Sequence, residues 1–348
     1  MPVTNYRILL IKPSALGDIM HSLPVLTALR RLYPRASIAW LVNRVYQPLL
    51  AGHPDLDETI PFDRGMVRTG VVSGTFWFLR FLRSLRREPF DMVIDLQGLL
   101  RSGLMTFATR ARRRIGLASA REGARWFYTE VVDDTSAMHA VERYWKVIEA
   151  LGSGAQEKRF VLPVAPDAAH WAHSELADCP RPWLALAVGS RWRTKRWPPE
   201  HFAALAQRAL DRFGGAVILV GTPDETAVSQ ATARLIHGPV RDFTGRTTLP
   251  QVAALLHAAD VTLANDTGPL HLAVALGRPV LAPYTCTKIE LTGPYGQTER
   301  AVATRVWCAG SLIRQCDRLD CMRELTPDRL WPILDEMLQT WPRRLQSA

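Results

Sequence analysis

A group of polar residues near position 265 has the composition and spacing of a ligand-binding turn. Asp266 and Thr267 follow the apolar run 261–264, and Gly268 leads into a helical segment that contains His271. A helix that starts at the carboxyl end of a parallel strand presents free backbone N–H groups, which favour an anion. His271 comes about one helical turn after Thr267, so a carboxylate, a hydroxyl and an imidazole are expected to face one spot. The alternative is that Asp266 and Thr267 only cap the helix.

A second candidate, Asp18, lies near the start of the chain. The apolar run Arg7–Lys12 is typical of a strand buried on both faces, and a helix is expected over about Asp18–Leu32. Asp18 therefore stands where the strand ends and the helix begins. It is either an acidic cap that the helix dipole stabilises or a catalytic base.

Strands and helices alternate along the chain, which predicts an α/β protein. The expected strands are 7–12, 37–42, 91–96, 183–188, 216–220, 261–264 and 279–283, and the expected helices are 18–32, 45–51, 64–87, 139–151, 200–213, 248–258, 269–276 and 327–341. A linker rich in Pro and Ala at about 163–168 separates a domain of residues 1–163 from one of residues 164–348. We expect two doubly wound, Rossmann-like domains whose strand ends face a shared cleft.

The formal net charge of +10 indicates an anionic partner, which could be a phosphorylated substrate, a membrane or a nucleic acid. No nucleic-acid-binding module is recognised, so binding to nucleic acid is not expected. Arginines are dense in the N-terminal half near predicted strand ends, where guanidinium groups suit bidentate recognition of phosphate. Those singled out are Arg101, Arg110, Arg112, Arg113, Arg114, Arg121 and Arg125.

The helix expected within Arg64–Arg87 is amphipathic and basic. Phe78 and Phe81 fall on one face, and Arg80 and Arg83 fall on another. Such a helix is usually an ordinary surface helix with its apolar face on the core. Because aromatic and arginine residues are mixed here, contact with a membrane surface stays open as a second role.

Five cysteines in a long chain without an export signal or an apolar run able to span a bilayer favour a reducing cytoplasm. Cys308, Cys316 and Cys321 could be ligands of a metal finger, but no C-x-x-C pair occurs and buried thiols are the favoured interpretation. Asp55 and Asp57 form a D-x-D pattern that binds metal and nucleotide in another fold. Here they are interpreted as a solvated turn, and no metal is expected.

Five stretches, taken in order, resemble the ADP-heptose:lipopolysaccharide heptosyltransferases of glycosyltransferase family 9. They are Lys12–Asp18, Asp95–Gly98, Lys195–Pro198, Gly221–Glu225 and Asn265–His271. The resemblance covers nearly the whole chain. The stretch from Ala120 to Arg143 is most similar to the heptosyltransferase I branch, which adds the first heptose to a Kdo residue of the inner core.

The resemblance implies the GT-B fold, with the acceptor on the N-terminal half, the nucleotide sugar on the C-terminal half, and a C-terminal helix that crosses back. It implies an inverting transfer of heptose from ADP-L-glycero-D-manno-heptose without a metal or another cofactor. Asp18 is then the general base that takes the proton of the acceptor hydroxyl. Lys195 and the helix start at Thr267 and Gly268 are expected to neutralise the departing ADP.

The resemblance also implies roles for other donor-site residues. Ser190 and Asp266 are expected to hold the diphosphate or sugar hydroxyls, His271 to line the same pocket, and Glu225 to hold the ribose. The expected acceptor-binding residues are Arg64, Arg68, Gln97, Arg101 and Arg121. The expected acceptor is of the Kdo-lipid A type, and the expected location is the cytoplasmic face of the inner membrane, as a peripheral protein.

The chain departs from the family pattern at Thr247, where an apolar residue against the adenine is common, so the base preference stays open. Two alternatives remain. One is a transferase of the same fold with another acceptor, such as a second core heptose or a protein, and the other is a non-catalytic GT-B protein that binds nucleotide or anionic lipid. A Rossmann dehydrogenase is disfavoured, because the first strand is not followed by G-x-G-x-x-G.

Overall fold

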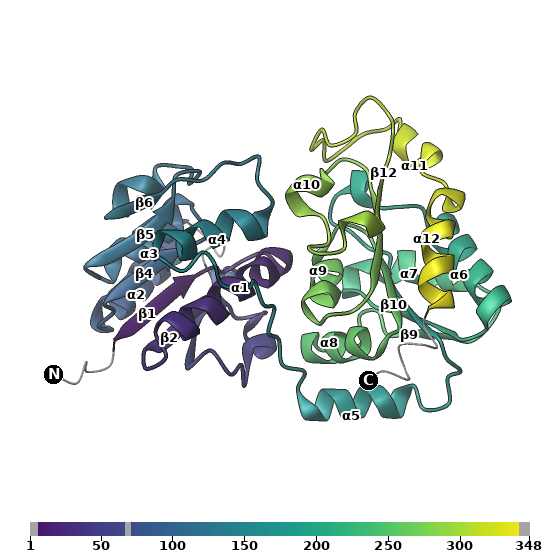
Figure 1. Ribbon diagram of the computed structural model, residues 1–348, viewed down its shortest axis with the longest axis horizontal. Coiled ribbons are helices and arrows are strands. Elements are labelled where there is room, and N and C mark those ends of the chain that lie inside the picture. The colour runs from purple at the N-terminus through teal and green to yellow at the C-terminus, as the bar shows by residue number, and fades with distance from the viewer. Residues whose placement is uncertain (1–5, 67–70, 341–348) are drawn as a thin grey trace. The chain divides into compact units, whose positions relative to one another are not determined.

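The computed structural model describes residues 6–66 and 71–340, and the chain divides into two compact units, Met1–Pro163 and Val164–Ala348 (Figure 1). Each unit contains a six-stranded sheet in which every strand pair is parallel. The expected α/β class with two doubly wound sheets is therefore confirmed. In the described ranges no helix has the length and the apolar character needed to cross a bilayer.

The sheet of the first unit has the strand order β3-β2-β1-β4-β5-β6. Its strands are β1 (Arg7–Ile11), β2 (Ser37–Asn43), β3 (Glu58–Phe62), β4 (Met92–Asp95), β5 (Arg113–Leu117) and β6 (Glu130–Val132). Its helices are α1 (Leu16–Leu32), α2 (Val71–Arg87), α3 (Leu100–Ala108) and α4 (Ala140–Ala150), with short 3-10 turns η1 (Gln47–Leu50) and η3 (Ala124–Phe127). The central strand β1 is fully buried from Ile8 to Ile11, as its apolar run predicts.

Two pairs of helices cover this sheet. Helix α1 packs on α4, and α2 packs on α3. Phe78, Phe81 and Leu85 of α2 pack into a core cluster that includes Leu9 and Ile11 of β1. The apolar face of α2 is therefore directed to the core, as in an ordinary surface helix.

The sheet of the second unit has the strand order β12-β11-β10-β7-β8-β9. Its strands are β7 (Trp183–Ala187), β8 (Ala216–Leu219), β9 (Val240–Asp242), β10 (Val261–Ala264), β11 (Val280–Tyr284) and β12 (Ala301–Ala303). Its helices are α5 (Pro166–Glu175), α6 (Pro199–Phe213), α7 (Thr226–Arg234), α8 (Leu249–Ala258), α9 (Gly268–Ala275), α10 (Ile289–Thr292), α11 (Asp320–Glu324) and α12 (Pro327–Gln339), with 3-10 turns η4 (Arg193–Lys195), η5 (Pro223–Glu225) and η6 (Thr298–Arg300). Residues Leu270–Ala275 of α9 are all buried, so this helix is embedded in the unit.

Several predicted elements differ from the structure for local reasons. The expected linker at 163–168 overlaps helix α5, which begins at Pro166 because proline is well suited to the first helical turn. Residues 45–51 form only the 3-10 turn η1. Among the unexpected strands, β3 contains Pro61, which an edge strand tolerates because its missing N–H is not needed for pairing. Strand β5 begins with Arg113, which pairs with Glu130 of β6 at 2.7 and 2.8 Å.

The basic helix α2 and the terminal helix α12 also differ from expectation. Arg64 lies in a turn and not in the helix, since α2 begins at Val71, and Arg68 lies outside the described residues. Helix α12 was expected to cross back to the first unit. As far as Gln339 it packs on α6 and β11 of its own unit, because its buried face, which includes Leu330 and Leu334, belongs to the core there.

Candidate active site

Asp18 lies in the first turn of α1, just after the carboxyl end of β1. Its Oδ2 accepts a hydrogen bond from the backbone N–H of Ala15 at 2.9 Å, and its Oδ1 accepts one from the hydroxyl of Tyr144 in α4 at 3.0 Å. The Nζ of Lys12 is 3.8 Å from Oδ1. The Asp18 side chain is still 39% exposed, so the carboxylate is fixed in orientation and open to a ligand.

Lys12 follows β1 directly and is buried. Its Nζ donates hydrogen bonds to the backbone oxygen of Leu96 at 3.0 Å and to the hydroxyl of Tyr144 at 2.8 Å. Because Tyr144 in turn donates to Asp18, a hydrogen-bonded chain runs from the ammonium group to the carboxylate. Burial alone lowers the pKa of Lys12, but the nearby charge of Asp18 and the contact with Tyr144 outweigh burial and raise this pKa.

The same neighbours control the protonation of Asp18. Burial raises the pKa of Asp18, but the charge of Lys12 and the hydrogen bonds from Ala15 and Tyr144 outweigh it, so the pKa lies below its usual value. Asp18 is therefore ionised at neutral pH and able to accept a proton. The bond from Ala15 is also the one that an acidic residue at N3 makes to a helix start. Capping and base catalysis do not exclude each other, because a carboxylate accepts several hydrogen bonds.

Gln97 follows β4 in a turn that Asp95 organises. The buried Asp95 carboxylate accepts hydrogen bonds from the backbone N–H groups of Gln97 at 2.9 Å and Gly98 at 3.1 Å, and from the Tyr128 hydroxyl at 2.7 Å. Burial raises the pKa of Asp95. The Oε1 atom of Gln97 is buried and has no hydrogen-bond partner among the residues that the structure describes.

The predicted acceptor arginines lie at different places on the first sheet. The backbone N–H of Arg121 donates to the oxygen of Gly98 at 2.8 Å, and Arg101 is in the first turn of α3, so both lie beside Gln97. Arg64 follows the edge strand β3, which is separated from β4 by β2 and β1. At the usual strand spacing this is about 14 Å away. The structure groups Gln97, Arg101 and Arg121 and leaves Arg64 apart.

Asp266 is the centre of the candidate site in the second unit. Its Oδ2 accepts hydrogen bonds from Lys195 Nζ and from the Thr287 hydroxyl, both at 2.6 Å. The Tyr284 hydroxyl is 3.2 Å from Oδ1, and His271 Nε2 is 3.4 Å from the same oxygen. Burial opposes ionisation of Asp266, but His271 and Lys195 outweigh it and hold the pKa of this carboxyl far below its usual value.

The start of α9 is not capped by a side chain. Thr267 occupies the N-cap position in an extended conformation, but its hydroxyl bonds the backbone oxygen of Asn265 at 3.2 Å and makes no capping bond. The Asp266 carboxylate is bound to Lys195, Tyr284 and Thr287. The interpretation of these residues as simple caps is therefore wrong for Thr267. The first N–H groups of α9 have the arrangement that suits an anion.

The Asn265 side chain contacts both ends of the loop that carries Ser190 and Lys195. Its Nδ2 donates to the backbone oxygen of Val188 at 2.7 Å, and its Oδ1 accepts from the backbone N–H of Trp197 at 3.1 Å. Both ends of the loop are thereby tied to the end of β10. Ser190 is buried within this loop.

Glu225 lies against the same loop. A Cβ atom at Gly189 would come within 2.0 Å of the Glu225 Cδ, so only glycine allows the two segments to approach this closely. The Oε2 of Glu225 accepts a hydrogen bond from the backbone N–H of Thr222 at 2.8 Å. The predicted donor residues therefore gather around the carboxyl ends of β7, β8 and β10.

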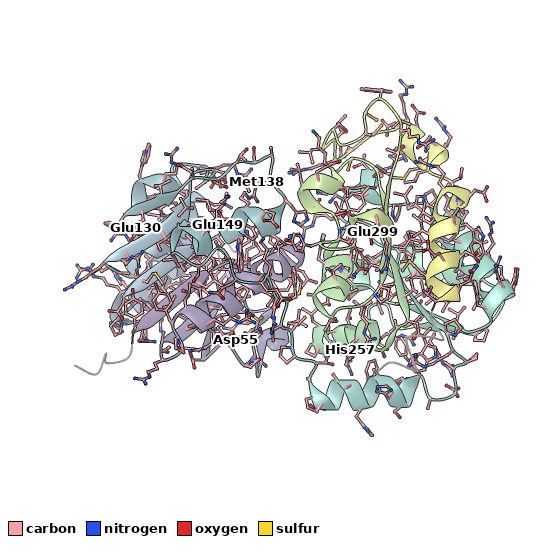
Figure 2. All side chains as sticks on the ribbon, in the orientation of Figure 1. Asp55, Glu130, Met138, Glu149, His257 and Glu299 are labelled. Carbon is pink, nitrogen blue, oxygen red and sulfur yellow. The ribbon has the colours of Figure 1, made fainter. Side chains whose placement is uncertain are left out.

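The D-x-D pattern is more than a solvated turn. Asp55 (labelled in Figure 2) accepts a hydrogen bond from the Thr27 hydroxyl at 2.9 Å. Asp57 accepts one from the backbone N–H of Ile38 at 2.7 Å and pairs with Arg30. These acids tie the end of α1 and the start of β2 to the connection before β3.

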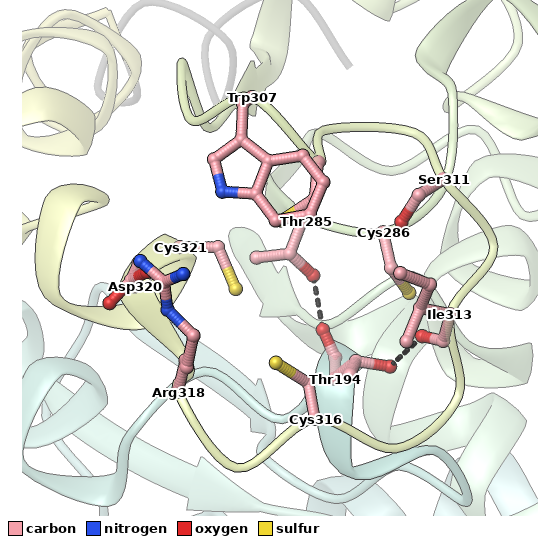
Figure 3. A pocket seen from close by; sticks show the side chains of 11 residues that line it. Thr194, Thr285, Cys286, Trp307, Ser311, Ile313, Cys316, Arg318, Asp320 and Cys321 are labelled. Atoms are coloured by element: carbon pink, nitrogen blue, oxygen red, sulfur yellow. Dashed lines mark hydrogen bonds and ion pairs between the residues drawn. The ribbon is translucent and has the colours of Figure 1, made fainter.

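Four of the five cysteines, Cys286, Cys308, Cys316 and Cys321, line a small pocket in the second unit, with Cys316 and Cys321 directed into it (Figure 3). Cys286 and Cys321 are buried, as expected for Cys321, but Cys308 and Cys316 are only partly buried. Burial raises the pKa of Cys321 to about 11. Across residues 6–66 and 71–340, no three His, Cys, Asp or Glu side chains are placed to hold a metal ion.

Comparison with known proteins decides the family. The family model for glycosyltransferase family 9 (heptosyltransferase) matches residues 78–321. The chain belongs to this family. It is 30% identical to lipopolysaccharide heptosyltransferase 1 of Pseudomonas aeruginosa, over 95% of this chain and 98% of that relative. It is 26% identical to lipopolysaccharide heptosyltransferase 2 of Escherichia coli, again over 95% and 98%.

A solved structure agrees with this result. The E. coli heptosyltransferase WaaC with ADP-2-deoxy-2-fluoro heptose superposes with a TM-score of 0.72 at 26% identity, covering 95% of this chain and 99% of that one. The expected resemblance and the GT-B fold class are confirmed, and the chain is a glycosyltransferase.

Sequence reasoning missed several polar neighbours in this family 9 glycosyltransferase. Tyr144 and Lys12 surround Asp18, and Tyr284 and Thr287 surround Asp266. Lys12 belongs to a motif already singled out, and its place at a strand end could have indicated a role. Tyr144, Tyr284 and Thr287 carry no such local signal, because their contacts depend on the tertiary fold.

Proposed function

We propose that this glycosyltransferase moves heptose from ADP-L-glycero-D-manno-heptose to a Kdo residue of the lipopolysaccharide inner core. The observation that carries the proposal is the accessible, ionised carboxylate of Asp18, held by Ala15 and Tyr144. Support for the donor comes from the relative bound to an ADP-heptose analogue. Support for the acceptor comes from the relative named heptosyltransferase 1.

In the proposed reaction Asp18 removes the proton from an acceptor hydroxyl. The oxygen attacks the anomeric carbon of the heptose, the bond from that carbon to the β-phosphate oxygen breaks, and ADP departs with the bonding electrons. Attack opposite the leaving group inverts the anomeric centre. The proton ends on the Asp18 carboxylate, which Tyr144 and Lys12 keep in place.

Lys195 and the N–H groups at Thr267 and Gly268 stabilise the departing diphosphate without a metal. Lys195 is paired with Asp266, and a phosphate would compete for the same ammonium group. Asp266 keeps the hydrogen bond from Thr287 and the contact with Tyr284 when Lys195 turns to the phosphate. The lysine can therefore exchange partners without leaving a buried charge unsatisfied.

The remaining donor residues take the roles that the resemblance implies. Ser190 binds the diphosphate or a sugar hydroxyl, since it lies in the loop that Asn265 anchors. His271 lines the same pocket beside Asp266, and Glu225 binds the ribose. Support for Glu225 is its close approach to Gly189, which lies just after the carboxyl end of β7.

The acceptor is proposed to be a Kdo-lipid A type glycolipid at the cytoplasmic face of the inner membrane. Gln97, Arg101 and Arg121 form the main recognition group, and Arg64 contributes from the end of the edge strand β3. Arg68, which lies outside the described residues, is kept as a further acceptor residue. The exposed guanidinium groups of Arg64, Arg101 and Arg121 suit phosphate and carboxylate groups of such a lipid. The enzyme then works as a peripheral cytoplasmic protein.

The proposal is tested by incubating the purified protein with ADP-heptose and Kdo-lipid A and measuring the product by mass spectrometry. A mass increase of one heptose on the Kdo acceptor supports it. A parallel reaction uses an acceptor that already carries the first heptose, since a heptosyltransferase 2 is also among the relatives. Transfer only to that second acceptor, or to neither, would refute the Kdo assignment.

A further inference from the structure

Large apolar side chains are exposed together on the first unit. Trp126 is 87% exposed and Phe107 is 57% exposed, and Leu100 also lies at the surface. Trp126 belongs to η3, and the other two belong to α3. A soluble surface carries single apolar residues without consequence, but a group of them on adjacent elements marks an interaction site.

The cluster is rigidly built. Helix α3 and η3 pack so closely that a Cβ atom at Gly103 would come within 2.7 Å of the Phe127 ring. The rings of Phe107 and Phe127 are 5.8 Å apart, and the Trp126 ring lies against Gly123, where a Cβ would be 3.1 Å from it. The two elements that carry the exposed rings, α3 and η3, are therefore packed firmly against each other.

The surroundings of these rings are strongly positive. Between Leu100 and Phe127 the chain has seven arginines and one acid, Glu122. Arg113 is neutralised by Glu130, and Arg114 donates to backbone oxygens. The other five are exposed, and they are Arg101, Arg110, Arg112, Arg121 and Arg125.

The face of α2 that was expected to meet the membrane is less suitable. The rings of Trp77 and Phe81 stack on each other at 5.5 Å, and both contact Phe62 of the core. Of the larger apolar side chains of α2 that the structure describes, from position 73 onward, Phe76 and Leu79 are exposed. Because α2 packs beside α3, these two side chains extend the same helical layer and do not replace the α3–η3 group.

We propose that this α3–η3 surface docks the enzyme on an anionic lipid bilayer. The surface consists of Leu100, Arg101, Phe107, Arg121, Arg125 and Trp126. Indole and phenyl rings enter the headgroup region, where amphipathic aromatics are stable, and the arginines bind lipid phosphates. The proposal rests on the proposed function in one respect: Arg101 and Arg121 also belong to the acceptor group, so a lipid acceptor would be taken directly from the membrane.

The test is co-sedimentation with vesicles in the absence of either substrate. Vesicles of phosphatidylethanolamine and phosphatidylglycerol should bind the protein, neutral phosphatidylcholine vesicles should bind it weakly, and salt should weaken the anionic interaction. The double variant Trp126→Ala/Phe107→Ser should lower the partition coefficient about tenfold, because two apolar anchors are removed. Trp307→Ala is the matched control, since Trp307 is 80% exposed in the second unit and should have no effect.

Thermal melting of each variant checks that the fold is intact. Equal vesicle binding by the double variant and the wild type, or no binding by the wild type, would overturn the proposal. Light scattering that shows a wild-type dimer lost in the double variant, without vesicle binding, would assign the surface to a second copy instead.

Vesicle binding without heptose transfer to Kdo would support the docking surface and refute the proposed acceptor. Activity of the double variant on a deacylated, soluble acceptor should equal that of the wild type.

Discussion

The two units contain the same trio of side chains in opposite arrangements. In the first unit Asp18 lies with Lys12 and Tyr144, and in the second Asp266 lies with Lys195 and Tyr284. In both, the carboxylate stands just before or within the first turn of a helix that follows a central strand. The shared trio shows that the residue types alone do not decide the chemistry of a site.

Exposure separates the two trios. In the first unit Lys12 is buried with 4% of its side chain exposed, and the carboxylate is accessible. In the second unit Asp266 is 4% exposed and Lys195 is 16% exposed. The group that can meet a substrate is therefore a base in one unit and a cation in the other. This is the division of labour that a transfer to a hydroxyl with a diphosphate leaving group requires.

The strongest test of this contrast is Asp18→Asn. The amide can still accept the bond from Ala15 but cannot take a proton, so kcat should fall about 10²-fold or more with donor affinity unchanged. Steady-state kinetics and calorimetry with ADP measure the two effects. Asp328→Asn is the control, because Asp328 is an exposed acid in the first turn of α12. If Asp18→Asn remains active and only its melting temperature is slightly lower, Asp18 is a helix cap and not a catalytic base.

A smaller effect is expected for Lys195→Gln. This change removes the accessible cation, so kcat/KM for the donor should fall by up to about 10²-fold, and ADP should bind more weakly. The fold should persist, because Asp266 keeps its contacts with Thr287 and Tyr284. Arg191→Gln removes an exposed charge from the same loop and serves as the control. Equal losses in both variants would mean that the loop acts through its total charge.

The third test removes the buried cation of the first unit with the variant Lys12→Met. The charge of Lys12 helps to hold the pKa of Asp18 below its usual value, so removal of this charge should raise the pKa of Asp18. Activity needs the ionised carboxylate and is lost as the pH falls through this pKa. The acid limb of the pH–rate profile should therefore move to higher pH.

The acid stability of the fold should change in the same direction as the acid limb. A carboxyl with a lowered pKa stabilises the folded state above its unfolded pKa, and this contribution is lost as the pH falls through the folded pKa. Lys12→Met should therefore unfold at a higher pH than the wild type during acid titration. Lys146→Met, in α4 and paired with Glu149, is the control. An unchanged acid limb in Lys12→Met would show that Lys12 does not tune Asp18.

Strand ends and helix starts were predictable from the sequence, because apolar runs and turn residues are local signals. This was enough to place Asp18, Gln97 and Asp266 at the ends of strands. The partners of these residues were not predictable, since Tyr144 is 126 positions from Asp18 and Lys195 is 71 positions from Asp266. Which side chain of each trio is buried depends on packing from distant elements, and no local pattern carries that information.

The strands that escaped prediction have a related cause. Strand β5 contains Arg113 and Arg114, and these charged residues interrupt the pattern of apolar residues that would indicate a strand. In the sheet Arg113 pairs with Glu130, and Arg114 donates to backbone oxygens. The exposure of the aromatic rings beside them was equally unpredictable from the sequence. Trp126 and Phe107 are apolar residues that any sequence pattern assigns to the core, and only the structure shows them at the surface.

The smallest expected effect is the response to EDTA, which should leave the initial rate unchanged. In the proposed function, the accessible cation of the second unit, Lys195, and the N–H groups of α9 supply the positive charge that a divalent metal supplies in other transferases. Rates are compared with and without EDTA and after adding Mg²⁺, with a magnesium-dependent transferase as the control for chelation. Loss of activity in EDTA, restored by Mg²⁺, would contradict the proposed difference in role between the two trios. The charge on the leaving group would then be carried by a metal and not by Lys195, and Lys195→Gln should in that case retain most of its activity.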